Sequence, residues 1–176
     1  MNAALLILRL VVGLGLAAHG AQKLFGWFGG HGLAGTGGYF EGLGFRPGKR
    51  FALLAGLGEA GGGLLLALGF GGPLGPALAV LVMIVAAWTV HRKNGFFAMN
   101  SGIELPLLYA AGAATVALAG PGAWSLDAAL GLRGLWTPAS AWLALAGGAL
   151  VAAGTLALRP AYVAQRVGRE EAMETS

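Results

Sequence analysis

The chain has 176 residues, of which 57% are hydrophobic and 10% charged, and its mean hydropathy is +0.74. Soluble domains carry about 25% charged residues, so this composition excludes an ordinary water-soluble domain and predicts an integral membrane protein. Cysteine is absent, which excludes disulfides and thiol chemistry and leaves any redox role to a bound cofactor or a partner. The net charge of +4 comes from basic residues at segment ends, not from one stripe, so we expect no nucleic-acid binding.

Five apolar segments approach the roughly 20 residues that a helix needs to cross a bilayer. They cover residues 3–24, 51–69, 73–91, 103–120 and 139–158. The first segment lacks a basic start and contains Arg9, so we expect a retained span and not a cleaved signal peptide. Small residues four apart, such as Gly13 and Ala17, favour close approach of helix backbones. The sequence therefore predicts an all-α, integral membrane helical bundle.

Polar residues gather at the end of the first segment. His19 and Lys23 are four residues apart, so on a helix they share one face, and Gln22 lies beside them. A lysine at the centre of a bilayer costs about 2.5 to 3.5 kcal/mol on insertion scales, and such groups usually face a partner or a cavity. We therefore expect these side chains to point into the bundle.

The connection from residue 27 to residue 48 is too apolar for an aqueous loop and too rich in glycine for a span. We predict an interfacial or re-entrant segment, with Thr36 capping a short helix that includes Tyr39, Phe40 and Glu41. Irregular backbone of this kind is tolerated at membrane depth only where protein shields it or where it lines a wet cavity.

Glu59 is the clearest anomaly among the apolar segments. Counted from Arg50 at 1.5 Å per residue, its carboxylate lies roughly 14 Å deep, near the bilayer centre. Arg9 lies roughly 22 Å along the first helix from Lys23, near the same level. An ion pair between Arg9 and Glu59 is therefore one structural explanation, since a buried carboxylate needs a partner or a proton.

The later segments add further polar groups. His91 ends the third segment, Asn94 follows in a short connection, and Glu104 opens the fourth segment before Pro106, which suits a first helical turn. We expect His19, Glu59, His91 and Glu104 to surround one intramembrane pocket, with Gln22, Lys23 and Asn94 as further binding residues.

The second connection, residues 121–138, is predicted to anchor the chain at the opposite interface. Trp124 is a typical interfacial residue, and Ser125 is expected to cap a short amphipathic turn that contains Asp127. We assign Arg9, Trp124 and Asp127 structural roles. The fifth segment carries no charge before Arg159, and a polar tail follows it.

Basic residues divide unequally between the two faces of the predicted bundle. If the segments alternate in direction, Arg133 lies alone on one face, Arg9 lies within the bilayer, and nine basic residues lie on the other face. These are Lys23, Arg46, Lys49, Arg50, Arg92, Lys93, Arg159, Arg166 and Arg169. The positive-inside rule makes the second face cytoplasmic, with an external N-terminus and a cytoplasmic C-terminus.

Several motifs in order resemble the DoxX family of small prokaryotic membrane proteins. They are His19-Gly20-x-Gln22-Lys23-Leu24-Phe25-Gly26, Gly35-Thr36 with Phe40 and Leu43-Gly44-Phe45, Ala55-Gly56-x-x-Glu59-x-x-Gly62-Gly63, His91-x-x-Asn94-Gly95-Phe96-Phe97, Glu104-x-Pro106, Gly120-Pro121-Gly122 and Trp124-Ser125-Leu126-Asp127. The resemblance covers about residues 3–130 and implies a four-helix unit in the inner or plasma membrane. We therefore expect a DoxX-like domain at 1–133, an additional transmembrane helix at 134–160 and a polar cytoplasmic tail at 161–176.

The resemblance and the polar residues together suggest three functions. Relatives include a membrane subunit of thiosulfate:quinone oxidoreductase, so the first is an oxidoreductase subunit that binds a quinone-like molecule, with histidine or glutamate as the proton donor. The alternatives are a proton-coupled transporter, which would be an oligomer if it forms a pore, and a non-catalytic scaffold that docks a soluble redox enzyme on the cytoplasmic face. No tight ligand pattern indicates a metal or haem site.

Overall fold

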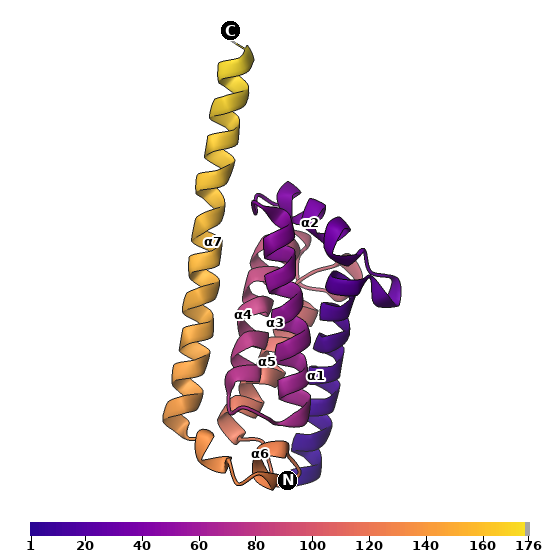
Figure 1. Cartoon of the computed structure of the whole chain (residues 1–176), viewed down its shortest axis with the longest axis vertical. Helices are drawn as coiled ribbons and strands as arrows, with labels where there is room; N and C mark the ends of the chain where they lie inside the picture. The colour runs from indigo at the N-terminus through magenta and orange to yellow at the C-terminus, as the bar shows by residue number, and fades with distance from the viewer. Residues whose placement is uncertain (175–176) are drawn as a thin grey trace.

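The computed structural model describes residues 1–174, and their side chains as far as Arg159. The regular secondary structure of this described part is helical, and five long helices lie side by side along the long axis of the molecule (Figure 1). These are α1 (Asn2–Phe25), α3 (Gly48–Leu68), α4 (Leu74–Ala86), α5 (Glu104–Ala119) and α7 (Pro138–Glu174). They coincide with the five apolar segments, so the predicted all-α membrane bundle is confirmed.

Short elements lie at the two ends of the bundle. The short helix α2 (Gly32–Gly42) lies at one end, which we call the α2 end, and α6 (Leu126–Ala129) lies beside the N-terminus at the other, the α6 end (Figure 1). Five single-turn elements complete the described part: η1 (Trp27–Gly29), η2 (Ala87–His91), η3 (Arg92–Asn94), η4 (Ala98–Asn100) and η5 (Arg133–Leu135).

Four helical stretches of the described chain are long and apolar enough to cross a membrane. They are Asn2–Phe25, Gly48–Leu68, Leu74–Asn94 and Pro138–Arg159. The helix α5 has 16 residues, which at 1.5 Å per residue is about 24 Å, somewhat shorter than a hydrocarbon core of about 30 Å. The chain is a multi-pass membrane protein, in which α5 packs against α1, α4 and α7.

The helices α1 and α3 approach each other through small residues on both sides. A Cβ added to Gly13 would lie 2.6 Å from the Gly63 carbonyl oxygen, and one added to Gly20 would collide with the backbone of Ala60. Glycine is therefore needed at both positions for backbone contact, as in other helix pairs packed through small residues. This contact also sets the register, with Gly20 level with Ala60 and Gly13 level with Gly63.

That register separates Arg9 from Glu59. Arg9 is 1% exposed and lies beside Gly69 at the α6 end, where its guanidinium donates to the carbonyl oxygens of Pro121 and Trp124. The ion pair suggested between Arg9 and Glu59 is therefore wrong. The prediction counted the depth of each residue from the end of its own helix, and this count does not include the offset between the two helices. The glycine contacts between α1 and α3 fix that offset and place Arg9 several helical turns away from Glu59.

Asp127 supports the structural role expected at the α6 end. Its carboxylate is fully buried and accepts hydrogen bonds from the backbone amides of Gly71 and Gly72 and from the indole nitrogen of Trp136, at 2.8 to 3.1 Å. The side chain of Ser125 accepts from the amide of Ala128 at 3.2 Å, so the predicted helix cap is confirmed. The turn between α3 and α4 is thus tied to α6 and η5.

The connection before α3 differs in one respect from the expectation. The helix α2 begins at Gly32, so Thr36 lies inside the helix, where it is buried, and His31 occupies the N-cap position without a side-chain hydrogen bond. The prediction that Thr36 caps this helix is wrong, because the helix begins one turn earlier.

At the other terminus, the apolar helix α7 continues to Glu174. The side chains expected to form the polar cytoplasmic tail, residues 161–176, lie outside those that the structure describes.

Candidate functional site

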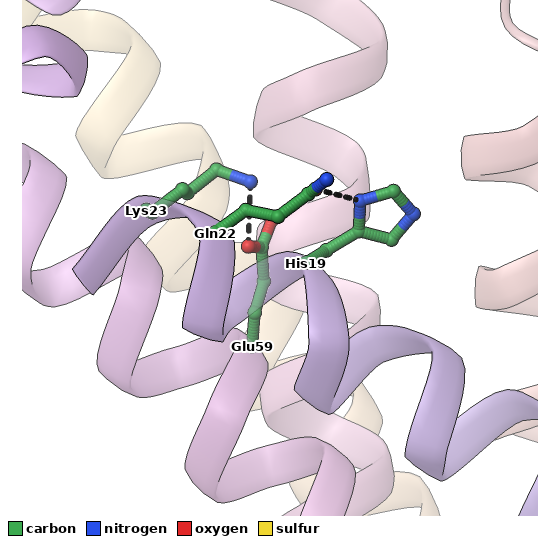
Figure 2. A network of polar contacts seen from close by, with 4 residues as sticks. All are labelled: His19, Gln22, Lys23 and Glu59. Carbon is green, nitrogen blue, oxygen red and sulfur yellow. Dashed lines mark hydrogen bonds and ion pairs between the residues drawn. The ribbon is translucent and has the colours of Figure 1, made fainter. Parts of the chain in front are cut away.

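Glu59 and Lys23 form an ion pair at the centre of the candidate site. Glu59 lies on the face of α3 that packs against α1 and is 2% exposed, and its Oε2 accepts from the Lys23 Nζ at 2.6 Å (Figure 2). The Lys23 side chain is 25% exposed. Gly56 and Gly63 flank Glu59 at helical spacing, so the backbone of α1 comes close enough for this contact. The carboxylate has a cationic partner, as a buried charge requires.

His19 and Gln22 form a second polar contact beside the ion pair. The His19 Nδ1 lies 3.1 Å from the Gln22 side-chain oxygen (Figure 2). The Gln22 amide donates to the Phe28 carbonyl oxygen at 3.1 Å. Because the oxygen can only accept, Nδ1 is the donor, and in the neutral ring Nε2 is then an acceptor. The ring packs edge-to-face on Tyr109, with the centroids 5.8 Å apart. His19 is thus held in one orientation.

These residues line a cavity of about 640 Å³ in the α2-end half of the bundle. This volume falls within the roughly 300 to 1,000 Å³ of small-molecule sites. Its polar lining comes from several elements: His19, Gln22, Lys23, His31, Thr36, Tyr39, Glu59, Thr89, His91, Tyr109 and Thr155. The remaining lining is mainly aliphatic and aromatic, with Phe40, Phe45 and Phe51 at the α2 end. A few convergent polar groups in an apolar cavity are typical of a binding site.

The last turn of the third span, which lines the cavity, is a π-helical turn and not an α-helical one. The element η2 is a π-helix, and Thr89, Val90 and His91 within it are consecutive lining residues. Thr89 donates to the Val85 carbonyl oxygen at 2.7 Å, and the His91 Nδ1 lies 2.7 Å from the Ser101 carbonyl oxygen. Single π turns inside helices frequently occur at functional sites.

The structure brings together five of the seven predicted pocket residues: His19, Gln22, Lys23, Glu59 and His91. Asn94 and Glu104 are not among the described lining residues. Asn94 donates to the Ser101 carbonyl oxygen at 3.2 Å, and Glu104 accepts from the Ala98 amide at 2.8 Å. Both side chains turn back onto the connection between η2 and α5, because its backbone amides and carbonyls need partners.

Several lining residues were not predicted as site residues. His31, Tyr39, Tyr109 and Thr155 all line the cavity, although they come from three separate parts of the chain: α2 with the residue before it, α5 and α7. His31 had a signal, since a histidine in a predicted re-entrant segment is an unusual polar group. Tyr109 and Thr155 lie in apolar stretches of α5 and α7, and only packing brings them to the cavity.

The chemistry that this arrangement can supply is hydrogen bonding and proton exchange. An ammonium, a carboxylate and imidazole groups meet beside apolar walls, so a polar head can be oriented and protonated there. Within the described side chains, no three histidine, aspartate or glutamate residues gather closely enough to hold a metal ion.

The sequence model of the DoxX family matches residues 4–92, about half of the chain. The matched range contains α1 to α4 and the Lys23–Glu59 pair, whereas α5 and α7 lie beyond it. No curated protein and no solved structure matches the chain.

Proposed function

The chain belongs to the DoxX family, and from that premise we propose that it is a membrane subunit of an oxidoreductase system that binds a quinone-like molecule. The cavity beside Glu59 is the proposed site. The observation that carries the proposal is the placement of the Lys23–Glu59 pair and His19 in the wall of a mainly apolar cavity within the spanning helices. Such a cavity suits a lipophilic molecule with a polar head.

The walls of the cavity match the two parts of such a molecule. Phe40, Phe45 and Phe51 offer aromatic surface to a ring, and aromatic pairs are worth about 0.5 to 1.5 kcal/mol beyond the area that they bury. The Lys23 ammonium offers a donor to a carbonyl oxygen. His19 offers a second donor, from Nε2, in its protonated form, because Nδ1 already donates to Gln22. A quinone ring lying between these groups would have hydrogen-bond partners for its oxygens and apolar contacts for its faces.

The residues around Glu59 would supply protons and not electrons. Reduction of one quinone to its quinol consumes two electrons and two protons. The chain has no cysteine, so the electrons would come from a soluble redox partner or its substrate. The Lys23 ammonium would donate to one quinone oxygen and give up its proton as the quinol forms, and a protonated His19 would supply the second proton from Nε2, which is general acid catalysis by positioned groups. The Glu59 carboxylate would hold the Lys23 ammonium in place.

The sidedness of the bundle would place that partner on the cytoplasmic face. Seven of the basic residues counted above belong to elements or connections of the α2 end: Lys23, Arg46, Lys49, Arg50, Arg92, Lys93 and Arg159. Arg133 belongs to η5 at the α6 end. The positive-inside rule then makes the α2 end cytoplasmic, in the cell membrane, with the N-terminus outside.

The position of the cavity favours binding over transport. The lining residues of α1 begin at His19, and those of α3 end at Glu59. Beyond this level, Gly13 of α1 and Gly63 of α3 are in backbone contact. A proton-coupled transporter needs access to the site from both faces, and these two helices are tightly packed toward the α6 end. A scaffold without a ligand is the remaining alternative, and the experiment below separates it from the proposal.

The test measures binding of a quinone to the full-length protein in lipid nanodiscs. A short-chain benzoquinone is titrated while tryptophan fluorescence is followed. We expect saturable binding, and we expect Glu59→Gln and His19→Ala to weaken it about tenfold or more, which corresponds to about 1.4 kcal/mol or more. Lys49→Gln, at an exposed residue of the same helix as Glu59, is the control and should bind like the wild type. Absence of saturable binding to the wild type would favour the scaffold.

A further inference from the structure

The cavity includes a wall from α7, which lies outside the range matched by the family model. Val151 and Thr155 of α7 line it. The first half of α7 is held against the bundle by small residues, since Ala141 and Ala152 are almost completely buried and a Cβ on Gly148 would lie 2.7 Å from the Ala77 carbonyl oxygen. The position of this wall is therefore set by close packing.

A hydrogen bond holds α7 at the other side of the cavity. The Arg159 side chain donates from Nε to the Leu43 carbonyl oxygen at 2.5 Å. Leu43 closes the C-terminal end of α2, and cationic side chains are favoured at helix C-termini. The segment of α7 that lines the cavity, Val151 to Thr155, is thus attached on both sides, at Gly148 and at Arg159.

The cavity reaches the lipid-facing surface beside this wall. Leu54 of α3 and Val151 of α7 both line it, yet their side chains are 65% and 57% exposed. Residues that combine these properties lie at the mouth of a cavity. Both belong to helical stretches apolar enough to cross a membrane, so in a bilayer we expect this mouth to open toward hydrocarbon.

The surface of the mouth is apolar. The Thr155 hydroxyl donates to the Val151 carbonyl oxygen of its own helix at 2.8 Å, so its proton is already engaged and its methyl group remains for contact. Leu54 lies five residues before Glu59, which is about 7.5 Å along α3. The lining thus changes from charged side chains at Lys23 and Glu59 to apolar side chains at the mouth within this short distance.

We propose that the ligand of this cavity is a lipid-like molecule whose apolar tail leaves the bundle between α3 and α7, past Leu54 and Val151. The polar head lies beside Lys23 and Glu59, and α7 determines which tails are accepted. The proposal rests on the proposed function for the head and adds the tail, the mouth and the role of α7. The tail adds van der Waals contacts with these residues, so we expect a tailed ligand to bind more tightly than a tailless one with the same head.

The experiment compares two ligands that share one head, with the full-length protein in nanodiscs. One is a benzoquinone without a tail and the other carries a ten-carbon alkyl tail. Val151→Trp places an indole in the mouth, and we expect it to weaken binding of the tailed ligand about tenfold, with the tailless ligand bound as by the wild type. Leu150→Trp is the matched control, because Leu150 is a neighbouring α7 residue, is 73% exposed and is not a lining residue.

The outcomes separate the tail from the head. Equal binding of both ligands by every variant, or an equal loss of both in Val151→Trp, overturns the proposed mouth and leaves the head site standing. Failure of the wild type to bind either ligand overturns the proposed function together with this inference. Val151→Ala removes only two methyl groups from the mouth and should weaken binding of the tailed ligand less than Val151→Trp does. A loss as large as that of Val151→Trp would count against a mouth that bulk can block.

Discussion

Replacing Lys23 with methionine removes the ammonium group that faces Glu59 and keeps a chain of similar length. The carboxylate is 2% exposed, and Lys23 Nζ lies 2.6 Å from it. Removal of one partner from a buried ion pair costs about 3 to 5 kcal/mol, because the other charge stays buried without compensation. Since the Lys23 side chain is 25% exposed, we take the lower end and expect Lys23→Met to lower the free energy of unfolding by about 3 kcal/mol.

A double-mutant cycle separates the pair from other effects of the substitution. The variants are Lys23→Met, Glu59→Gln and the combination of both, with unfolding followed by tryptophan fluorescence in detergent micelles at increasing denaturant. The neutral amide no longer needs a cation, so we expect the double variant to recover about 2 kcal/mol, within the range of coupling energies for contacting residues. Lys49→Met, at an exposed lysine of α3, is the control. Strictly additive losses would show that the two groups do not stabilise each other, and the reasoning on the pair would fail.

The remaining predictions concern packing, the α6 end and sidedness. Gly20→Val should destabilise the protein by about 1 to 3 kcal/mol, because the added side chain overpacks against α3. The control is Gly61→Ala, which has open space for its Cβ and should be neutral or stabilising by up to about 1 kcal/mol. Equal thermal stability of the two variants would count against the α1–α3 contact. Asp127→Asn should cost about 1 to 3 kcal/mol in denaturant unfolding, because one buried donor loses its acceptor, and the exposed Glu41→Gln serves as the control. The chain has no cysteine, so a membrane-impermeant thiol reagent should label Leu130→Cys in intact cells and Met99→Cys only after permeabilisation; the reverse pattern would invert the proposed orientation.

The composition and segment lengths were sufficient for the architecture. The amount of apolar sequence requires a bilayer or a very large core, and backbone groups in a bilayer must bond internally, so helices are the expected solution. The small residues Gly13 and Ala17 also indicated a close helix contact, and both lie against Gly63 where α1 packs on α3. These features depend on local chemistry and need no knowledge of which helices are neighbours.

The pairing of charges could not be read from the chain. Depth counted along separate helices suggested Arg9 as the partner of Glu59, but the glycine contacts shift α1 against α3 until Lys23 meets the carboxylate. Arg9 instead binds the carbonyl oxygens of Pro121 and Trp124. A relative slide of a few residues changes every cross-helix contact, and only side-chain packing along the whole interface decides it.

The cavity shows the same division between local and tertiary information. The sequence by itself determined that polar groups at His19, Lys23, Glu59 and His91 had to face inward, because lipid solvates them poorly. Tertiary structure alone decided that Glu104 turns to its own connecting loop and that α7 supplies a wall through Thr155. A side chain's need for a partner is encoded locally, whereas the identity of that partner depends on helices that are distant in the chain and meet only in the folded bundle.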